Sequence, residues 1–382
     1  MRTEKKSVKV IIAGGGTGGH VFPAVAIAGE FLERADVQDV LFVGTEKGLE
    51  ARVLRDMGFT LRTINVEGVK GRGAAKIIVS LLKIPWSIAQ SVSIIRNFRP
   101  DIVLGVGGYA SGPAVIAAHF MGIKTAIAEQ NALPGFTNKM LGRFVDKIFI
   151  SFPDRQKWFA DAKTVVTGNP VRRGFVTGSK KSRKTGDTFS ILIFGGSQGA
   201  RAINRAMLDS MEYLEEINGR LAITHQTGDK DMDEVSAAYR DCGVDAKAHS
   251  FITDMSSAYE SADLLICRAG ATSIAEITAS GKASVLIPYP FAAGGHQELN
   301  ALVLADAGAA EMILESELDG KRLAGAIRRL LNSPGTINRM EKESEKLGNV
   351  KAAKNIVDEC MTVLSQGTGD SSQKENIICT DG

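Results

Sequence analysis

The sequence predicts an α/β protein with two domains, each built on a parallel β-sheet, and three observations support this prediction. First, its 382 residues are more than one ordinary domain needs. Second, short apolar runs rich in β-branched residues alternate with helical patterns, as expected where helices connect parallel strands. Third, each half of the chain begins with an apolar run, a glycine-rich turn and a helical pattern, which indicates a weak internal duplication.

The duplication is visible in two segments. VIIAGGGTGGHVFPAVAIA opens the first half (10–28), and ILIFGGSQGARAINRAM opens the second (191–207). One Rossmann-like unit needs a single start of this kind, so the repeat predicts two Rossmann-like domains. Nine apolar runs are predicted as their strands: residues 8–13, 39–44, 101–106, 124–129, 147–150, 189–194, 221–226, 263–267 and 283–288.

The junction between the domains is predicted within TGNPVRRGF (167–175). Gly168 and Pro170 interrupt any regular element there, as an interdomain hinge requires. We therefore expect an N-terminal domain over residues 1–171 and a C-terminal domain over residues 172–350.

The chain beyond residue 350 is predicted in two parts. Residues 351–365 end a helical, charged stretch that begins near residue 321, and they are expected to form a helix that packs back on the N-terminal domain. Residues 366–382 are polar and aperiodic, which predicts a disordered tail.

Composition argues against several classes of function. The net charge is only +3, and aromatic and basic residues are not interleaved, so no nucleic-acid partner is predicted. The four cysteines are scattered without metal-ligand spacing and are expected to be reduced thiols in a cytoplasm. Asp229, Asp231 and Asp233 match the metal-binding DxD pattern in spelling only, because they lie at an apparent helix start, where carboxylates interact favourably with the helix dipole. No metal site is predicted.

The first glycine-rich turn, residues 14–19, is a candidate anion site. Its glycines let the backbone approach a ligand, and the helix start offers free N–H groups. The turn also satisfies the dinucleotide pattern GxGxxG, but the acidic residue that an NAD site needs after the second strand, Glu46, comes one step late. His20 follows the turn and could act as a general base near neutral pH; the alternative is a histidine that only caps or packs at the helix start.

Polar residues follow two strands of the second half. Ser197 lies in the glycine-rich turn at 195–199, where its hydroxyl and the backbone N–H groups suit a diphosphate; the alternative is a purely structural turn. Gln297 and Asn300 open another predicted helix, and their amides suit the hydroxyls of a neutral polyol because they both donate and accept hydrogen bonds. Ligands bind at the carboxyl ends of strands in open parallel sheets, which favours a functional role for such turns.

Glu276 lies on the predicted helix after the strand at 263–267. Its carboxylate could accept hydrogen bonds from both hydroxyls of a ribose. Alternatively, it forms a capping box with Thr272 or Ser273 at the start of that helix.

Eight motifs, in order along the chain, together resemble the MurG family. These peripheral membrane enzymes add N-acetylglucosamine to the undecaprenyl-diphosphate-linked muramyl-pentapeptide of bacterial peptidoglycan. The motifs are GGGTGGH (14–20), GGYASGP (107–113), EQNALPG (129–135), GNPVR (168–172), GGSQG (195–199), HQTG (225–228), CRAGATSIAEI (267–277) and HQELNA (296–301).

The resemblance implies a GT-B glycosyltransferase fold, in which two Rossmann-like domains with parallel sheets face each other across a cleft. It implies inverting transfer of N-acetylglucosamine from UDP-GlcNAc to the C4 hydroxyl of undecaprenyl-diphospho-muramyl-pentapeptide, with no cofactor and no metal. It also implies a peripheral location on the cytoplasmic face of the cell membrane, with the inner leaflet as a partner.

The resemblance further implies roles for individual residues. His20 is the implied catalytic base, or the group that positions the acceptor, and Thr17, Gly18, Gly19 and Tyr109 are implied to bind the acceptor in the N-terminal domain. The implied donor contacts are Arg172 and Ser197 with the phosphates, the backbone near Ile252 with uracil, Glu276 with the ribose, and Asn131, Gln297 and Gln198 with the N-acetylglucosamine.

Residues 74–99 carry more apolar side chains than one helix face needs. Ile78, Leu82 and Trp86 lie off the stripe that is expected to face the core, and basic residues lie nearby, which suits docking on an anionic leaflet. The alternative is a helix that is buried on two sides. The core stripe comprises Ile77, Leu81, Ile84, Ile88, Val92 and Ile95, and the basic residues are Lys70, Arg72, Lys76 and Lys83.

Two other functions are compatible with these features. The first is a UDP-sugar enzyme of the same fold that acts on another lipid, such as a diacylglycerol glycosyltransferase, and would prefer UDP-galactose or UDP-glucose. The second, from a different class, is a nicotinamide-dependent oxidoreductase or a non-catalytic nucleotide sensor, which NAD but not UDP would protect.

Overall fold

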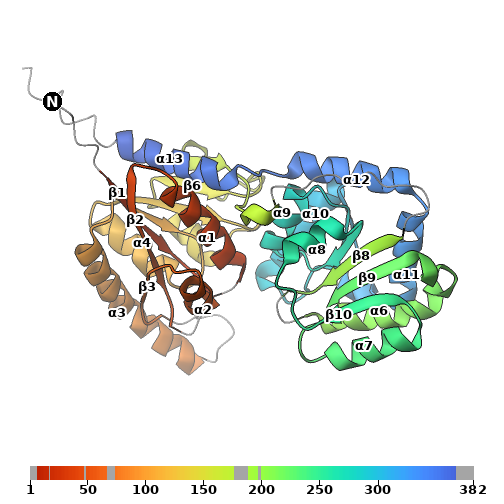
Figure 1. Ribbon diagram of the computed structural model, residues 1–382. Coiled ribbons are helices and arrows are strands. Elements are labelled where there is room, and N and C mark those ends of the chain that lie inside the picture. The colour runs from red at the N-terminus through yellow and green to blue at the C-terminus, as the bar shows by residue number, and fades with distance from the viewer. Residues whose placement is uncertain are drawn as a thin grey trace, which may run out of the picture. The chain divides into compact units, whose positions relative to one another are not determined.

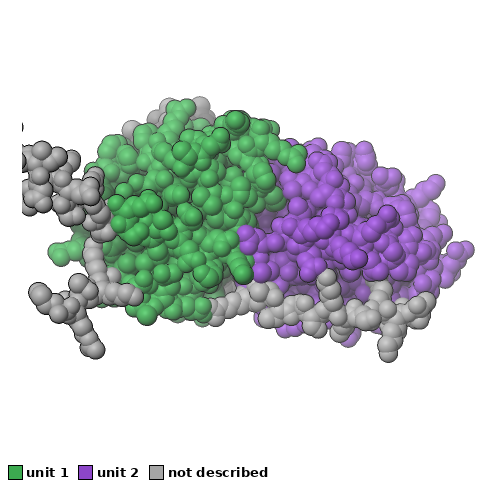
Figure 2. All heavy atoms as spheres, turned by 90° about the horizontal axis from the view of Figure 1, so that it is seen from above, with its two compact units in different colours: residues 1–130, 134–170, 351–382 green, residues 131–133, 171–350 purple. Residues whose placement is uncertain are grey.

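The computed structural model describes residues 7–16, 18–46, 49–66, 74–175, 188–196 and 199–366 (Figure 1). The chain divides into two compact units, which Figure 2 shows in separate colours. Unit 1 comprises residues 1–130, 134–170 and 351–382, and unit 2 comprises residues 131–133 and 171–350. Except for Gln366, the segment expected to form a disordered tail lies outside the described residues.

Unit 1 is built on a seven-stranded parallel sheet with the strand order β3-β2-β1-β4-β5-β6-β7. Its inner strands are nearly continuous apolar runs, because a parallel sheet has helices on both faces. The strands are β1 (Val8–Ala13), β2 (Val37–Gly44), β3 (Leu61–Thr63), β4 (Ile102–Gly105), β5 (Lys124–Glu129), β6 (Lys147–Ile150) and β7 (Thr164–Val166).

Two apolar clusters cover the two faces of this sheet. One joins inward-facing strand residues to α1, α2 and α13, with Phe31, Leu54 and Ile356 among its buried members. The other joins the sheet to α3, α4 and α5, with Ile95 and Leu141 among its members. The helices are α1 (Gly18–Leu32), α2 (Leu49–Asp56), α3 (Ala74–Phe98), α4 (Ser111–Phe120), α5 (Phe136–Leu141) and α13 (Ala352–Gln366).

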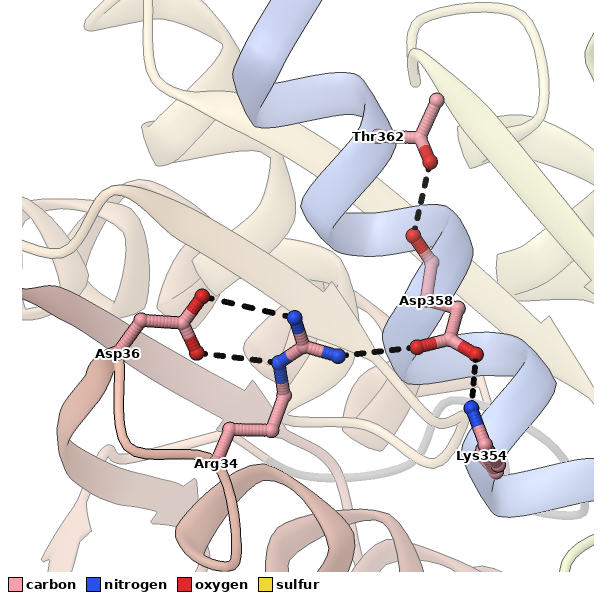
Figure 3. A network of polar contacts seen from close by, with 5 residues as sticks. All are labelled: Arg34, Asp36, Lys354, Asp358 and Thr362. Atoms are coloured by element: carbon pink, nitrogen blue, oxygen red, sulfur yellow. Dashed lines mark hydrogen bonds and ion pairs between the residues drawn. The ribbon is translucent and has the colours of Figure 1, made fainter.

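Helix α13 is the last described element, and it packs in unit 1. Ile356 and Cys360 are completely buried in the cluster that contains α1. Arg34, just after α1, donates to Asp358 of α13 over 2.9 Å and also to Asp36 (Figure 3). Partly exposed ion pairs contribute about 0–1 kcal/mol, whereas burying a large apolar side chain contributes roughly 1.5–3 kcal/mol. Apolar burial therefore holds α13 in unit 1 more strongly than the ion pairs do.

Unit 2 is built on a six-stranded parallel sheet with the order β10-β9-β8-β11-β12-β13. Its main apolar cluster joins the sheet to α6, α7, α11 and α12. The strands are β8 (Phe189–Phe194), β9 (Leu221–Gln226), β10 (Asp245–His249), β11 (Leu264–Cys267), β12 (Ser284–Leu286) and β13 (Ala310–Met312). The helices are α6 (Arg201–Leu214), α7 (Met232–Asp241), α8 (Met255–Ser261), α9 (Ala271–Ala279), α10 (His296–Asp306), α11 (Gly320–Leu331) and α12 (Pro334–Leu347).

All nine predicted strands form, with ends that differ by at most two residues from the prediction. The four further strands, β3, β7, β10 and β13, are the two edge strands of each sheet. An edge strand has fewer neighbours and buries less of its surface, so it lacks the apolar run that marks an inner strand. The helical pattern expected from about residue 321 corresponds to three helices, α11, α12 and α13. Short 3₁₀ turns lie at Asp161–Lys163, Arg173–Phe175, Glu215–Arg220, Ala293–Gly295 and Glu315–Glu317.

Candidate functional site

Each sheet has one point at which the chain reverses the direction in which it adds strands. In unit 1 this switch point lies between β1 and β4, and in unit 2 it lies between β8 and β11. The connections leave toward opposite sides there, so the loops at the carboxyl ends of these strands leave room for a ligand. Both duplicated glycine-rich turns follow a strand at a switch point, and each unit therefore has one candidate ligand site.

Two glycine-rich loops meet backbone to backbone at the switch point of unit 1. The N–H of Gly15 donates to the carbonyl of Gly107 over 3.3 Å. A Cβ atom on Gly14 would lie 2.5 Å from that carbonyl oxygen, and one on Gly108 would lie 2.2 Å from the oxygen of Gly15. Gly107 and Gly108 also have φ angles of +90° and +80°. Glycine is required here both for close approach and for the backbone conformation.

Most of the residues predicted on the acceptor side lie beside these loops. Gly18, Gly19 and His20 form the first turn of α1. Tyr109 follows the second loop and is half exposed. Thr17 lies outside the described residues.

The His20 ring is half-buried and is held on two sides. A Cβ atom on Gly107 would lie 2.8 Å from Cε1 and Nδ1 of the ring, so the imidazole packs directly on the second loop. Nδ1 of His20 lies 3.0 Å from Oε1 of Gln130, a buried residue that directly follows β5. Sequence reasoning assigned no role to Gln130, although it belongs to the EQNALPG motif. Its contact with His20 depends on how β5 lies beside β4 and β1, which no local pattern shows.

The glycine-rich turn of unit 2 also requires close approach. A Cβ atom on Gly199 would lie 1.9 Å from the carbonyl oxygen of Thr227, and Gly196 and Gly199 have φ angles of +104° and +73°. The turn thus packs against the end of β9. Ser197 and Gln198, the residues predicted to contact the donor, lie outside the described residues.

Gln226, the last residue of β9, connects this turn to the segment that contains Ile252. Its Nε2 donates to the carbonyl of Gly196 over 2.8 Å, and its Oε1 accepts the N–H of Ile252 over 2.8 Å. The side chain is almost completely buried. Because the N–H of Ile252 is donated to Gln226, the carbonyl oxygen is the backbone group of Ile252 that is left to contact a base.

Arg172 and Glu276, both predicted donor contacts, form an ion pair. Nη2 of Arg172 lies 2.9 Å from Oε1 of Glu276, whose side chain is 7% exposed, against 36% for Arg172. Burial raises the pKa of Glu276, and the neighbouring guanidinium opposes that increase. The structure therefore brings together a cation suited to a phosphate and a carboxylate suited to ribose hydroxyls.

The capping-box alternative for Glu276 is wrong. Helix α9 starts at Ala271, its N-cap is Gly270, and no side chain caps it. A capping box needs Ser or Thr at the N-cap and the carboxylate three residues later, whereas Glu276 lies farther along the helix. Its carboxylate is used for the pair with Arg172 instead.

The predicted amide residues of unit 2 have different roles. Asn300 is completely buried; its Oδ1 accepts the N–H of Ala132 over 2.9 Å, and its Nδ2 donates to Oδ1 of Asn131 over 3.2 Å. Gln297 is half-buried, and its Oε1 accepts the N–H of Tyr289 over 3.0 Å. Asn300 therefore holds Asn131 in place, whereas the NH₂ group of Gln297 can donate to a sugar.

A buried polar network lies at the end of β9. His225 contacts the Tyr239 hydroxyl through Nδ1 at 2.8 Å and Oδ1 of Asn204 through Nε2 at 3.0 Å. Nδ2 of Asn204 donates to the carbonyl of Thr227 over 2.9 Å and to Asp231 over 2.8 Å. Burial lowers the pKa of His225 to about 3, so this imidazole is neutral at physiological pH. Asp231, one of the DxD carboxylates, thus accepts a hydrogen bond from another side chain of the protein.

Helix α3 exposes part of its predicted docking face. Trp86 is 62% exposed, Ile88 and Val92 are partly buried, and Ile95 is buried. Phe120, at the end of neighbouring helix α4, is 80% exposed. The side chains of residues 74–82 lie outside the described part of the structure. None of the described helices is long and apolar enough to cross a membrane.

Comparisons with known proteins cover both units. The N-terminal domain of glycosyltransferase family 28 matches residues 10–150, and its C-terminal domain matches residues 190–359. A protein of Syntrophus aciditrophicus named UDP-N-acetylglucosamine--N-acetylmuramyl-(pentapeptide) pyrophosphoryl-undecaprenol N-acetylglucosamine transferase is 58% identical over 358 residues, which are 94% of this chain and 99% of that protein. A protein of the same name from Geobacter sp. strain M21 is 51% identical over 370 residues, which are 97% of this chain and 99% of that protein. The crystal structure of Acinetobacter baumannii MurG matches with a TM-score of 0.76 and 31% identity, covering 93% of this chain and 99% of that one.

Proposed function

The chain belongs to the MurG family of glycosyltransferase family 28, and we propose that it transfers N-acetylglucosamine from UDP-GlcNAc to undecaprenyl-diphospho-muramyl-pentapeptide. The nearly full-length similarity to transferases of that name carries this proposal. The fold, with two Rossmann-like units of parallel sheet, is that of a GT-B glycosyltransferase. The acceptor atom is the C4 hydroxyl of the muramyl sugar, and the product serves peptidoglycan synthesis.

Unit 2 is proposed to bind the donor. As the anomeric C–O bond breaks, negative charge grows on the UDP diphosphate, and Arg172 with the N–H groups of the 195–199 turn can stabilise that charge. Glu276 accepts hydrogen bonds from the ribose, and the backbone at Ile252 contacts uracil. Further proposed donor contacts are Ser197, Gln198, Asn131 and Gln297.

Unit 1 is proposed to bind the acceptor. The two glycine loops lie beside the start of α1, whose N–H groups favour the acceptor diphosphate. The proposed acceptor contacts are Thr17, Gly18, Gly19 and Tyr109, which in the sequence belong to these glycine-rich segments or directly follow them.

His20 is proposed as the general base. It takes the proton of the C4 hydroxyl while the hydroxyl oxygen forms a bond to the anomeric carbon and the electron pair of the breaking C–O bond leaves with UDP. Attack opposite to the leaving group converts the α-linked sugar of the donor into a β-1,4 linkage. Base assistance of this kind typically contributes about 10²–10⁴-fold in rate.

The location proposed is the cytoplasmic face of the cell membrane, in peripheral association. Trp86 and Phe120 are large apolar side chains exposed to water, and the helices that carry them pack against each other. Lys83, on the same helix as Trp86, adds positive charge. Exposed aromatic residues with nearby cations suit an anionic leaflet.

The test of the function is UDP release with donor and acceptor varied separately. We expect release with UDP-GlcNAc and a lipid-diphosphate muramyl acceptor, and loss of release when either is omitted. Turnover without the acceptor would contradict the proposal. Preference for UDP-glucose or UDP-galactose with diacylglycerol would indicate the other lipid glycosyltransferase instead.

The oxidoreductase alternative is not supported, because the chain belongs to a glycosyltransferase family over both units. Protection of the protein by NAD but not by UDP would reopen it.

In the variant His20→Ala, we expect kcat to fall about 10²-fold or more while affinity for UDP-GlcNAc is kept. Wild-type turnover in this variant would remove the base role from His20.

A further inference from the structure

We propose that Gln130 positions His20 and sets its tautomer, so that Nε2 is the atom that accepts the proton of the acceptor hydroxyl. This inference rests on the proposed function, in which His20 is the base. It starts from one contact within unit 1, the 3.0 Å approach of His20 Nδ1 to Gln130 Oε1.

The orientation of the Gln130 amide follows from its second contact. Its other terminal atom lies 3.2 Å from the carbonyl oxygen of Ala128. A backbone carbonyl can only accept a hydrogen bond, so the atom facing it is the NH₂ group. The atom facing His20 is therefore the amide oxygen, which can only accept.

The tautomer of His20 follows in turn. An oxygen acceptor opposite Nδ1 requires a proton on Nδ1, and in a neutral imidazole the lone pair is then on Nε2. No described residue forms a hydrogen bond with Nε2. Gln130 is 2% exposed, so water does not compete at its amide and the orientation is retained.

The surroundings of the ring leave Gln130 as the group that sets its tautomer. A small cavity beside the ring is lined by uncharged residues: Gly14, Gly15, Val21, Ala24, Phe42, Leu54 and Val106. Gly107, on which the ring packs, is also uncharged. The carboxylate next to Gln130 in sequence, Glu129, accepts hydrogen bonds from Gly135 N and Asn138 Nδ2.

A neutral amide on Nδ1 and a carboxylate in the same place would act differently on the protonation of the ring. A carboxylate there would keep the proton on Nδ1 and would also stabilise the imidazolium, so the base would be protonated over a wider pH range. An amide fixes the same tautomer without that charge. A methionine of similar size would remove the hydrogen bond and leave both tautomers available.

The first measurement is made on the wild-type protein, and a variant serves only to assign the signal. In protein labelled with ¹⁵N-histidine, which contains five histidines, the His20 signal is assigned by its loss in His20→Ala. We expect Nδ1 to show the shift of a protonated ring nitrogen and Nε2 that of an unprotonated one. The opposite tautomer would overturn the proposal, whether or not the enzyme is active.

The second measurement is the pH dependence of kcat in wild type, Gln130→Glu and Gln130→Met. In Gln130→Glu we expect the acid limb to move upward by about one pH unit or more, with activity approaching wild type at high pH. In Gln130→Met we expect kcat to fall about tenfold or more at every pH while KM for UDP-GlcNAc is unchanged. Recovery of the glutamate variant alone at high pH identifies the hydrogen bond to Nδ1 as the cause.

The matched control is Gln90→Glu. Oε1 of Gln90 also accepts a hydrogen bond, from the N–H of Asn65 at 2.8 Å in the same unit, so the same substitution is made away from the ring. We expect a wild-type pH profile. An unshifted acid limb in Gln130→Glu, or equal losses in both Gln130 variants at high pH, would overturn the positioning role. Absence of acceptor-dependent turnover in wild type would instead overturn the proposed function, and the tautomer measurement distinguishes the two failures.

Discussion

Arg172 donates a hydrogen bond to Glu276, with 2.9 Å between Nη2 and Oε1, and this pair joins the residue proposed for the donor phosphates to the residue proposed for the ribose. The carboxylate is buried, whereas more than a third of the Arg172 side chain is exposed. Glu276 therefore depends on Arg172 for compensation of its charge, while Arg172 remains accessible to a ligand.

Removing the guanidinium should destabilise unit 2. In Arg172→Met we expect the free energy of unfolding to fall by about 1–3 kcal/mol, less than for a fully buried pair because Arg172 is partly exposed. Burial raises the pKa of Glu276, and a protonated Glu276 has no charge that needs a neighbouring cation. The loss of stability relative to wild type should therefore be smaller at pH 5 than at pH 8. Urea unfolding at both pH values measures this; the control Arg328→Met, at an exposed arginine, should change stability by less than about 0.5 kcal/mol.

Glu276→Gln tests the ribose contact separately from stability. The amide oxygen can still accept from Arg172, but it is a weaker acceptor for the ribose hydroxyls, so we expect the Kd for UDP-GlcNAc to rise about tenfold. Calorimetry with UDP-GlcNAc measures the change. An unaltered Kd would show that Glu276 has only the structural role of pairing with Arg172.

Two substitutions of Gln226 should change the affinities for uridine and for UDP in different ways. Gln226→Met removes the hydrogen bonds to both Gly196 and Ile252, so we expect affinity for both ligands to fall about tenfold. Gln226→Glu can still accept from Ile252 N but places a negative charge at the proposed diphosphate turn. UDP binding should therefore weaken more than uridine binding in this variant. Equal weakening of the two ligands by the glutamate would contradict the proposed position of the phosphates.

The buried His225 should make the protein sensitive to acid. Its pKa is lowered to about 3 in the folded state, whereas an unfolded histidine has a pKa of about 6.5, so the unfolded state binds the additional proton between these values. Stability should fall as the pH is lowered from 6.5, by up to about 1.4 kcal/mol per pH unit from this residue. The ¹⁵N signals of His225 follow its charge directly. A signal that titrates between pH 5 and 7 in the folded protein would contradict this account.

Membrane docking should depend on the exposed aromatic residues of unit 1. In Trp86→Ser and Phe120→Ser we expect binding to vesicles containing anionic phosphatidylglycerol to fall by about tenfold each. Co-sedimentation measures it, and Tyr213→Ser, at an exposed aromatic residue of unit 2, should bind as wild type does. Unchanged binding in both unit 1 variants would remove this surface from the proposal.

The inner strands of both sheets could be predicted from the sequence because parallel strands buried on both faces require continuous apolar runs. Two of the edge strands could not be predicted in this way. DAKAH (245–249) alternates between apolar and polar residues, and LRT (61–63) is too short to show an apolar run. Their pairing is decided by the neighbouring strand, which supplies the missing hydrogen bonds.

Some residues of the candidate site could be recognised from the sequence, and others could not. His20, Arg172 and Glu276 are chemically active residue types beside glycine turns or strand ends, and such positions can be recognised locally. Gln130 and Gln226 could not be assigned, since a glutamine after an apolar strand shows no preference for any partner. The capping-box alternative for Glu276 was wrong because local spacing does not include Arg172, which is distant in sequence and supplies the competing contact.

By itself, the sequence determined the class of fold, the duplicated start of the two halves and the residues able to do chemistry. Apolar periodicity and glycine turns are local properties, and a chain of eight ordered motifs specifies a family. Only the tertiary structure decided the partners of those residues: which side chain faces Nδ1 of His20, what Glu276 pairs with, and which side chain accepts the N–H of Ile252. Hydrogen bonds depend on distance and direction between atoms far apart in sequence, and strand order in the sheets sets both.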